Sequence, residues 1–504
     1  MGPIEGLLYG FSVALTPTNL LACFIGVLIG TIVGVLPGIG PIGAMALLLP
    51  STFALSPATA LIMLAGIYYG SMYGGSTTSI LVNVPGEVAS VITAIDGYQM
   101  ARRGRAGAAL AVSAVGSFVA GTLGVLGLIL FATLLAEVAL RFGPPEFFAL
   151  TVFGLAVLSR LSGGPLVKSL LMVGLGLALG SVGMEPISGV SRFTFGSIQL
   201  SQGIELVPVA MGLFGIAEIL TLAESRGGLP RAMAVRLREL LPTREEWRRS
   251  AGPIGRGSVL GFLVGLIPGP AAVLSTFLSY SVERRLSKRP QEFGQGAIEG
   301  VAGPEAANNG ASVGAFVPLL ALGIPFAPAT AVLLGALVIH GIQPGPLLMT
   351  ERPEVFWGIA ASMYIGNAIL LILNLPLIGL FVSVLRLPQH LLLSLVVLLC
   401  LVGTYSVNNS LLDLWVLVGM GFLGYLFRKL GFEPAVVVLA LVLGPMMEKT
   451  FRQTLFMARG DWGAILLRPL TLALLLAGAL IFVLPGLHRA LRRALARRAP
   501  APPV

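Results

Sequence analysis

Apolar runs of roughly 20 residues recur along this chain of 504 residues, and each is long enough to cross a bilayer as a helix. Only 11% of the residues are charged, whereas a soluble domain carries about 25%, so the chain cannot be mainly soluble. A transmembrane β-barrel would need alternating apolar and polar positions, and that pattern is absent. The sequence therefore predicts an all-α integral membrane protein with roughly 10–12 spans.

The positive charge is concentrated in two segments. The net charge is +10, with eight Arg against three Glu from Arg226 to Arg256 and five Arg without an acid from His488 to Arg498. Nucleic acid could attract such clusters, but beside membrane spans they are typical of cytoplasmic loops. We therefore divide the chain into a first transmembrane repeat (1–225), a basic cytoplasmic linker (226–252), a second transmembrane repeat (253–487) and a basic cytoplasmic tail (488–504). The linker fits either an amphipathic surface helix or a solvated connection.

Two Pro-Gly pairs interrupt the apolar runs at matching places. Segment 30–38 (GTIVGVLPG) returns 231 residues later as segment 261–269 (GFLVGLIPG). Pro lacks a backbone N–H and Gly lacks a Cβ, so each pair predicts the end of one helix and the start of another. At membrane depth such a break is tolerated only inside protein or beside a cavity. Breaks at matching places in two halves indicate the binding site of a secondary transporter.

A second block repeats with a different offset. Glycines 70 and 74 and Pro85 align with glycines 310 and 314 and Pro325 at a shift of 240 residues. The stretch from Gly70 to Glu87 is rich in small residues and is expected to form a second interrupted membrane segment. The order of the two blocks is the same in both halves, which indicates two pseudo-symmetric repeats. The sequence does not decide whether the repeats are inverted or parallel.

The glycines at the breaks are the first candidate site residues. A helix that starts after a break presents free N–H groups and the positive end of its dipole, which can hold a carboxylate without a buried Arg or Lys. We assign Gly38, Gly40 and Gly269 to such a substrate site. A purely structural kink is the alternative.

Polar clusters near the breaks complete the candidate substrate site, because hydroxyls and amides can bind a carboxylate or a hard cation. In a membrane they can instead hydrogen-bond within their own helix or to a neighbour. The first cluster is Ser76, Thr77, Thr78 and Ser79 with Asn83 and Pro85, and its counterpart is Asn308, Asn309, Gly310 and Ser312 with Pro325.

Acidic residues are candidates for ion coupling. Glu305, together with Asn309, could bind a coupling Na⁺ or carry H⁺, or Glu305 could simply mark the membrane edge. Glu87 and Asp96 are expected at a helix end or in a loop. The chain has no Walker A sequence and no His-Glu-x-x-His, so we predict a transporter and not an enzyme, with no cofactor other than the coupling ion.

Several stretches, in order along nearly the whole chain, resemble the large membrane subunit (the permease) of the tripartite tricarboxylate transporters. They are Gly34–Gly40 (GVLPGIG), Tyr69–Ser76 (YGSMYGGS), Asn83–Gly86 (NVPG), Asp96–Ala101 (DGYQMA), Arg192–Gly196 (RFTFG), Glu305–Asn309 (EAANN), Leu322–Pro325 (LGIP) and Leu443–Glu448 (LGPMME). One departure is Glu185, where we would expect Asp.

The resemblance implies a multi-pass subunit of the bacterial inner membrane. It implies as partners a small four-helix membrane subunit, a periplasmic solute-binding protein and a di- or tricarboxylate such as citrate, imported with Na⁺ or H⁺. Inverted repeats and an elevator-like alternating-access motion are further implications. The alternative is a channel or exporter of organic anions that needs no binding protein. The sequence leaves a homo-oligomer open and predicts contact with lipid but not with nucleic acid.

Overall fold

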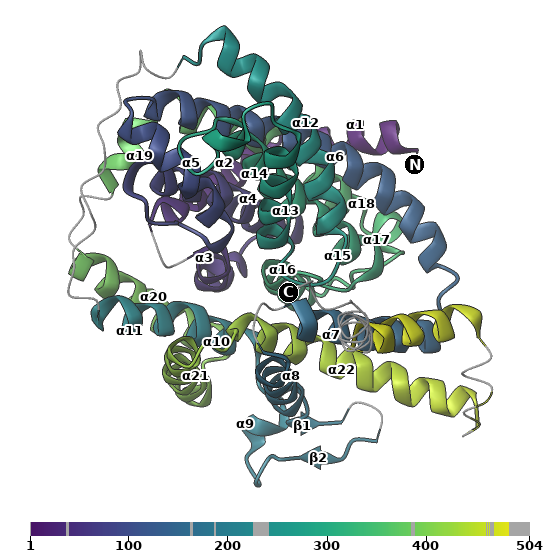
Figure 1. Cartoon of the computed structure of the whole chain (residues 1–504). Helices are drawn as coiled ribbons and strands as arrows, with labels where there is room; N and C mark the ends of the chain where they lie inside the picture. The colour runs from purple at the N-terminus through teal and green to yellow at the C-terminus, as the bar shows by residue number, and fades with distance from the viewer. Residues whose placement is uncertain are drawn as a thin grey trace, which may run out of the picture. The chain divides into compact units, whose positions relative to one another are not determined.

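The structure is a computed structural model that describes residues 2–36, 40–161, 165–185, 188–224, 241–384, 389–459, 461, 463 and 468–482. In these residues the regular structure is helical apart from one two-stranded antiparallel sheet (Figure 1). The chain forms two compact units: unit 1 is Met1–Leu140 with Ile204–Leu430, and unit 2 is Arg141–Gly203 with Gly431–Val504. Each unit thus combines a segment from the first half of the chain with one from the second.

Unit 1 contains most of the helices. They are α1 (Pro3–Ala14), α2 (Pro17–Val35), α3 (Gly40–Leu48), α4 (Pro57–Val82), α5 (Val91–Arg102), α6 (Ala106–Ala139), α10 (Leu206–Ala210), α11 (Ala217–Glu224), α12 (Arg244–Gly265), α13 (Ala271–Leu286), α14 (Glu299–Gly314), α15 (Phe316–Leu322), α16 (Pro328–Ile339), α17 (Leu348–Glu351), α18 (Pro353–Asn374), α19 (Ile378–Val384), α20 (Gln389–Asn408) and α21 (Leu411–Lys429). A π-helical turn, Met211–Ile216, joins α10 to α11.

Unit 2 is smaller. It contains α7 (Pro144–Leu161), α8 (Leu166–Gly180), β1 (Gly183–Met184), β2 (Ser191–Arg192), α9 (Ile198–Ser201) and α22 (Pro434–Met457), followed by an apolar helix at Pro469–Phe482. Strands β1 and β2 pair as an antiparallel hairpin.

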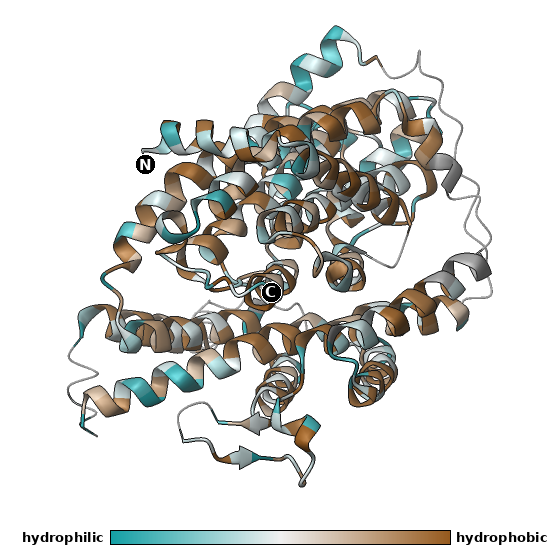
Figure 2. Ribbon diagram, turned by 180° about the vertical axis from the view of Figure 1, so that it is seen from behind, coloured by the Kyte–Doolittle hydropathy of each residue, from teal (hydrophilic) through white to brown (hydrophobic). Residues whose placement is uncertain are grey.

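Length and apolar composition identify membrane-spanning helices in both units. Among the described residues six helices are long and apolar enough to cross a bilayer, namely α2, α6, the continuous helix Leu206–Glu224, α18, α21 and α22. Shorter apolar helices of 10–17 residues accompany them. Figure 2 shows apolar residues along the helices of the chain. These features confirm an all-α membrane protein.

Helices end and restart at both predicted breaks. Helix α2 ends at Val35 and α3 begins at Gly40; Pro37 and Gly38 themselves lie outside the described residues. In the second half α12 ends at Gly265 and α13 begins at Ala271. Gly269 between them has a φ of 131° and donates its N–H to the carbonyl oxygen of Phe326 at 2.9 Å. Unit 1 therefore contains two helix–break–helix elements.

The interruption predicted for the stretch from Gly70 to Glu87 lies at the end of that stretch. Helix α4 is continuous from Pro57 to Val82 and ends at Asn83, whose φ of 58° is left-handed. The irregular part of the stretch is therefore confined to residues 83–87. The small residues do not break the helix, because they are its contact surface with α2.

The contact between α2 and α4 is made again between α12 and α14. In each pair, a Cβ added to three glycines spaced four residues apart would lie less than 3.0 Å from carbonyl oxygens of the partner helix. The pairs in the first half are Gly26 with Met63, Gly30 with Ile67 and Gly34 with Ser71; those in the second half are Gly257 with Gly303, Gly261 with Ala307 and Gly265 with Ala311. The offsets are the same 231 and 240 residues found in the sequence, so the two blocks form one repeated packing unit.

The end of the polar linker belongs to a long helix. Thr243 caps α12: its hydroxyl accepts from Glu246 N at 3.2 Å and its N–H donates to Glu246 Oε2 at 2.6 Å. Helix α12 then runs without a break from the charged segment into the apolar run. Residues 226–240 of the predicted linker lie outside the described residues.

Replacement of a contact glycine should destabilise unit 1. We expect Gly261→Ala to lower the Tm, because the added Cβ would overlap the backbone of Ala307 and such overpacking costs about 1–3 kcal/mol. Gly255→Ala is the matched control on the same helix, since Gly255 is exposed and a Cβ there meets nothing within 4 Å. Thermal unfolding in detergent measures both variants, and equal Tm values would contradict the close helix contact.

Candidate functional site

A buried carboxylate lies where helices α4, α5, α6 and α14 of unit 1 meet. Glu305 of α14 is fully buried. It accepts hydrogen bonds from the hydroxyls of Ser76 on α4 and Thr93 on α5, and from Ser113 Oγ on α6 at 3.3 Å. The whole of α14 from Gly300 to Gly314 is buried, so the carboxylate of Glu305 is enclosed by protein.

A second buried carboxylate lies beside the next turn of α14. Asn308 donates its Nδ2 to Glu87 Oε1 at 2.5 Å. Glu87 precedes the short turn Val88–Ser90, and Ser90 Oγ donates to the Glu87 carbonyl oxygen at 2.8 Å. Ser79 Oγ of α4 in turn donates to Ser90 Oγ at 2.8 Å. The first hydroxyl cluster thus supports the loop that carries Glu87.

Asn308 leaves one polar atom without a partner. The residue is fully buried, and its Oδ1 has no hydrogen bond. The neighbouring Asn309 is better satisfied, because its Nδ2 donates to Ser117 Oγ at 2.7 Å and to the Glu305 carbonyl oxygen at 3.3 Å. A buried amide oxygen without a donor is costly, so Asn308 Oδ1 is an open acceptor beside Glu87.

Neither buried carboxylate is neutralised by a basic side chain. Among the ion pairs of the described residues, none includes Glu87 or Glu305. An isolated charge in a low-dielectric interior costs several kcal/mol. Hydroxyl and amide donors offset part of that cost, and a proton or a bound cation would offset the rest.

The remaining candidate residues differ in their hydrogen bonds, burial and packing. Thr78 and Ser312 hydrogen-bond within their own helices, to the carbonyl oxygens of Gly75 and Asn308 at 3.2 and 2.9 Å. Thr77, Pro325 and Gly269 are buried, whereas Asn83 is exposed at the end of α4 and Pro85 is half-buried. Gly40 opens α3 beside free space, and Gly310 packs on the carbonyl oxygen of Ser258. Gly38 is outside the described residues.

Sequence reasoning did not assign Glu87, Thr93, Ser113 and Ser117 to a site. Thr93, Ser113 and Ser117 are single hydroxyls in helices of ordinary composition, and nothing in the sequence marks them. Residues 310–314 read Gly-x-Ser-x-Gly, the spacing of a hydrolase nucleophile elbow. They lie inside α14, not at a strand-to-helix turn, so the nucleophile elbow does not form.

The start of α14 is fixed by a second group of polar contacts. Asp96 lies inside α5 and is fully buried, so the prediction of a helix end or loop is wrong. Its Oδ1 accepts the N–H groups of Gly294, Gly296 and Ala297 at 2.7–2.9 Å, and its Oδ2 accepts the hydroxyl of Tyr280 at 2.9 Å. These bonds tie α5 to the loop that leads into α14.

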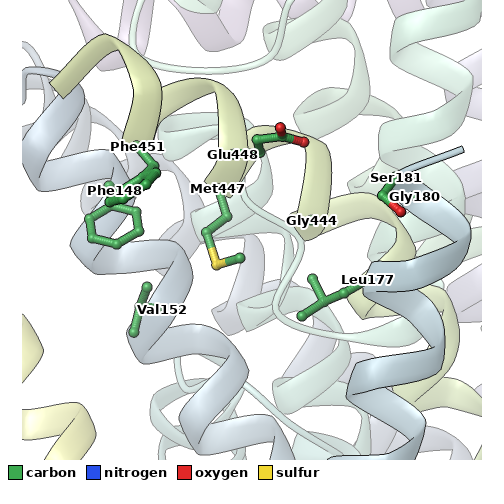
Figure 3. A pocket seen from close by; sticks show the side chains of 9 residues that line it. All are labelled: Phe148, Val152, Leu177, Gly180, Ser181, Gly444, Met447, Glu448 and Phe451. Carbon is green, nitrogen blue, oxygen red and sulfur yellow. The ribbon is translucent and has the colours of Figure 1, made fainter. Parts of the chain in front are cut away.

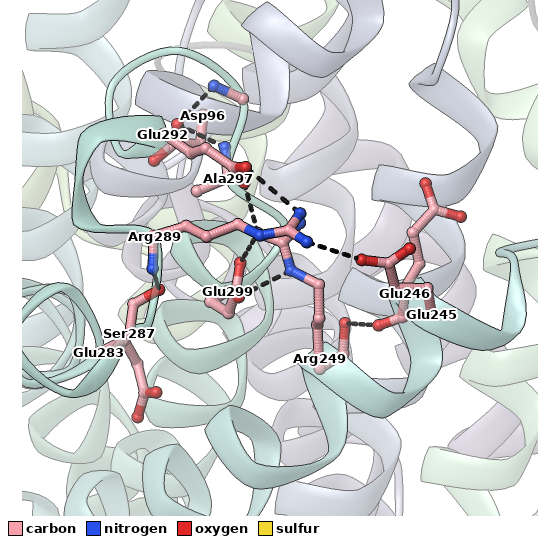
Figure 4. Close-up of polar contacts among 12 residues, drawn as sticks. Asp96, Glu245, Glu246, Arg249, Glu283, Ser287, Arg289, Glu292, Ala297 and Glu299 are labelled. Atoms are coloured by element: carbon pink, nitrogen blue, oxygen red, sulfur yellow. Dashed lines mark hydrogen bonds and ion pairs between the residues drawn. The ribbon is translucent and has the colours of Figure 1, made fainter.

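Arg249 of α12 adds an ion-pair link to the same loop (Figure 4). Its Nη2 lies 2.5 Å from Glu292 and 2.7 Å from Glu299, the first residue of α14. Burial alone would raise the pKa of Glu292, but the guanidinium groups of Arg249 and Arg289 hold that pKa below its usual value. The pairs are partly exposed, so their contribution is modest. Together with Asp96 they position the helix that carries Glu305 and Asn308.

Unit 2 holds a separate apolar pocket of about 420 Å³. It lies among α7, α8 and α22 (Figure 3) and is lined by Phe148, Val152, Leu177, Gly180, Ser181, Gly444, Met447, Glu448 and Phe451. Only Ser181 and Glu448 bring polar side chains to it. The polar chemistry of the carboxylate site is therefore not repeated in this pocket.

Multi-pass helical architecture, duplicated helix breaks and buried polar groups between the repeats together define a membrane transporter. Residues 20–439 match the model of the tripartite tricarboxylate transporter TctA family. The chain belongs to this family, whose permeases are multi-pass proteins of the bacterial inner membrane.

Two relatives from Agrobacterium vitis extend the comparison. An uncharacterized 52.8 kDa protein in the TAR-I ttuC′ 3′ region is 50% identical over 492 residues, covering 97% of this chain and 98% of that protein. An uncharacterized protein in the TAR-II ttuC′ 3′ region is 48% identical over 224 residues, covering 44% of this chain and 93% of that protein. No solved structure matches the chain.

Loss of the Asp96 carboxylate should loosen the start of α14. We expect Asp96→Asn to lower the Tm, because hydrogen bonds to a charged acceptor contribute about 1.5–3 kcal/mol and the amide cannot accept both the loop N–H groups and the Tyr280 hydroxyl. Tyr280→Phe removes one of these bonds and should have a smaller effect. Thermal unfolding in detergent compares the variants. A larger loss for Tyr280→Phe than for Asp96→Asn would contradict this role.

Proposed function

We propose that the chain is the permease subunit for uptake of a di- or tricarboxylate, such as citrate, by secondary active transport coupled to Na⁺ or H⁺. A periplasmic solute-binding protein delivers the anion, and a small membrane subunit completes the complex. Membership of the family supports the substrate class and the partners. The observation that carries the coupling is the pair of buried carboxylates, Glu87 and Glu305, without a basic partner.

The coupling of anion uptake to Na⁺ or H⁺ depends in this proposal on the negative charges of Glu87 and Glu305. Moving a net charge across the membrane against its potential costs about 2.3 kcal/mol per 100 mV, so a polyvalent anion needs accompanying cations. In the proposed mechanism Na⁺ or H⁺ binds at Glu305 and at the Glu87–Asn308 pair, where Asn308 Oδ1 is open. Carboxylate and amide oxygens are suitable ligands for a hard cation. Occupancy neutralises the site before the anion binds.

The helix starts after the two breaks are the proposed anion site. The first N–H groups of α3 and α13 have no acceptor within their own helices, and the helix dipole favours negative charge at that end. The space beside Gly40, where a Cβ would meet nothing within 4 Å, supports access to the start of α3. Substrate carboxylates would accept these N–H groups.

The duplicated glycine contacts support alternating access. Helices α2 and α4 form one closely packed pair and α12 and α14 form another, so each pair is suited to move as a rigid piece. We propose that the repeats are inverted in the membrane and that the motion is elevator-like. Inverted repeats of this kind are common in secondary transporters.

Removal of the buried charges should abolish coupled uptake. We expect Glu305→Gln and Glu87→Gln each to reduce uptake driven by a Na⁺ or pH gradient about tenfold or more, a factor that corresponds to about 1.4 kcal/mol. Bulky replacements, Asn308→Leu and Ser76→Leu, should have the same effect by filling the site. Thr133→Ala is the control, because that hydroxyl lies outside the candidate site and bonds carbonyl oxygens of its own helix α6.

The measurement is uptake of labelled citrate and other carboxylates into proteoliposomes that contain both membrane subunits, with purified binding protein outside. A sodium gradient or a pH gradient is applied alone to identify the coupling ion. Full gradient-driven uptake by both Gln variants would exclude these carboxylates from coupling. Uptake that is indifferent to the binding protein would favour a channel or exporter of organic anions.

A further inference from the structure

The β1–β2 hairpin of unit 2 carries exposed apolar side chains that neither the fold nor the carboxylate site uses. Phe193, Phe195 and Ile198, which we call the aromatic tip, are 62%, 91% and 85% exposed. Phe193 directly follows Arg192, the last residue of β2, and Ile198 is the first residue of α9. Exposed large apolar groups gathered in one loop are typical of interaction sites.

The backbone of the tip is unusual for its residue types. Phe193 and Phe195 have left-handed φ angles of 53° and 48°, which bulky residues rarely adopt. Such conformations persist where the surroundings enforce them, and they cluster at functional sites. An irregular loop of this kind is not tolerated against lipid hydrocarbon, so the tip lies outside the apolar core of the bilayer.

The tip is held in place by ion pairs to α22. Arg192 binds Glu448 in a bidentate manner, with distances of 2.7 and 3.0 Å, and Arg452 donates to the same carboxylate at 3.0 and 3.1 Å. A bidentate guanidinium–carboxylate pair fixes orientation as well as distance. The aromatic tip is therefore a preformed surface on a rigid base.

The order of charges along the chain places the tip on the external side of the membrane. One spanning helix, Leu206–Glu224, separates the hairpin from the Arg-rich segment that starts at Arg226. Within unit 2, Arg160 lies in the last turn of α7 and Lys168 in the first turn of α8, whereas the hairpin follows the opposite end of α8. Basic segments beside membrane spans lie in the cytoplasm. The Arg-rich segment and the basic residues at these ends of α7 and α8 therefore both place the hairpin on the external side.

The composition of the tip favours a protein partner over a lipid surface. Residues 193–203 (FTFGSIQLSQG) contain no charged side chain. Loops and helices that bind membrane surfaces usually add Lys or Arg to attract anionic lipid. The cores of protein interfaces are instead rich in aromatic residues and depleted of charge, with polar uncharged groups such as Ser197 and Gln199 available for hydrogen bonds.

We propose that the aromatic tip is the docking site for the periplasmic solute-binding protein, an inference that rests on the proposed function. The external side, the rigid base and the uncharged aromatic surface all fit a folded protein that arrives from the periplasm. Phe193 and Phe195 insert into an apolar recess of the partner. Ile198 and the surrounding Ser and Gln side chains form the rim.

The test uses both membrane subunits in nanodiscs and the purified binding protein of the same transporter. We expect the double variant Phe193→Asn with Phe195→Asn to raise the Kd about tenfold or more, as for loss of aromatic hot-spot residues. Asn tolerates the left-handed backbone, so the hairpin keeps its fold. Phe456→Ala is the matched control, because Phe456 is 71% exposed on α22 of the same unit but outside the tip.

The outcomes separate this inference from the proposed function. An unchanged Kd in the double variant, with binding and carboxylate uptake by the wild type intact, overturns the docking site and leaves the proposed function standing. A wild type that transports carboxylates without binding this protein overturns the docking site and the requirement for delivery. A wild type that binds the protein through the tip but transports no carboxylate supports the docking site and overturns the proposed transport activity.

Fluorescence of a Phe195→Trp variant distinguishes the other occupants. We expect a blue shift of the emission when the binding protein is added, because the ring then leaves water. Quenching by brominated lipid before that addition would overturn the proposal in favour of a membrane anchor. A blue shift found only in nanodiscs with two copies of the chain would overturn it in favour of self-association.

Discussion

Direct contact between helix backbones is the constraint on which the rest of unit 1 depends. Three glycines spaced four residues apart on α2 let α4 approach closely, and three on α12 do the same for α14. Carbonyl oxygens of α4 and α14 then contact the glycine backbone directly. In lipid there is little hydrophobic gain from bringing helices together, so van der Waals contact of this kind drives association. The same contact leaves the opposite faces of α4 and α14 free for polar side chains. Ser76 and Glu305 meet on those faces, although 229 residues separate them.

This packing explains how the protein tolerates buried acids. Glu87 and Glu305 are costly to bury without a basic partner, and their hydroxyl and amide donors return only part of that cost. The stability must come from elsewhere, and the tight helix pairs, the Asp96 contacts with the loop before α14, and the Arg249 ion pairs are the available sources. Asp96, Arg249 and Glu299 near the start of α14 are paired, whereas Asn308 Oδ1 in its middle is not. The contrast separates residues that hold the helix from residues that are free to bind a ligand.

Local signals in the sequence predicted the membrane class, the two helix breaks and the offsets of the repeat, because each depends on a few neighbouring residues. The Gly-x-x-x-Gly spacing of Gly30 and Gly34 is typical of close helix contact, and both glycines do contact α4. Helix α4 continues through Gly70 and Gly74, because packing against α2 overrides the low helix propensity of glycine. The partners of Glu305 could not be predicted, since Thr93 and Ser113 reach it only through tertiary structure. Asp96 looked like a loop residue because acids rarely lie buried in a helix.

Helix α14 connects the two acids physically. Glu305 and Asn308 are three residues apart, so they lie on neighbouring positions of one helix face. One bonds hydroxyls of α4, α5 and α6, and the other bonds Glu87 in the loop after α4. Any movement of α14 relative to these neighbours must break both sets of bonds together. In the proposed function, a cation or proton that binds at either acid therefore changes the energy of the same movement. Under this proposal, ion occupancy and the position of α14 are linked through shared hydrogen bonds, without a further relay between distant sites.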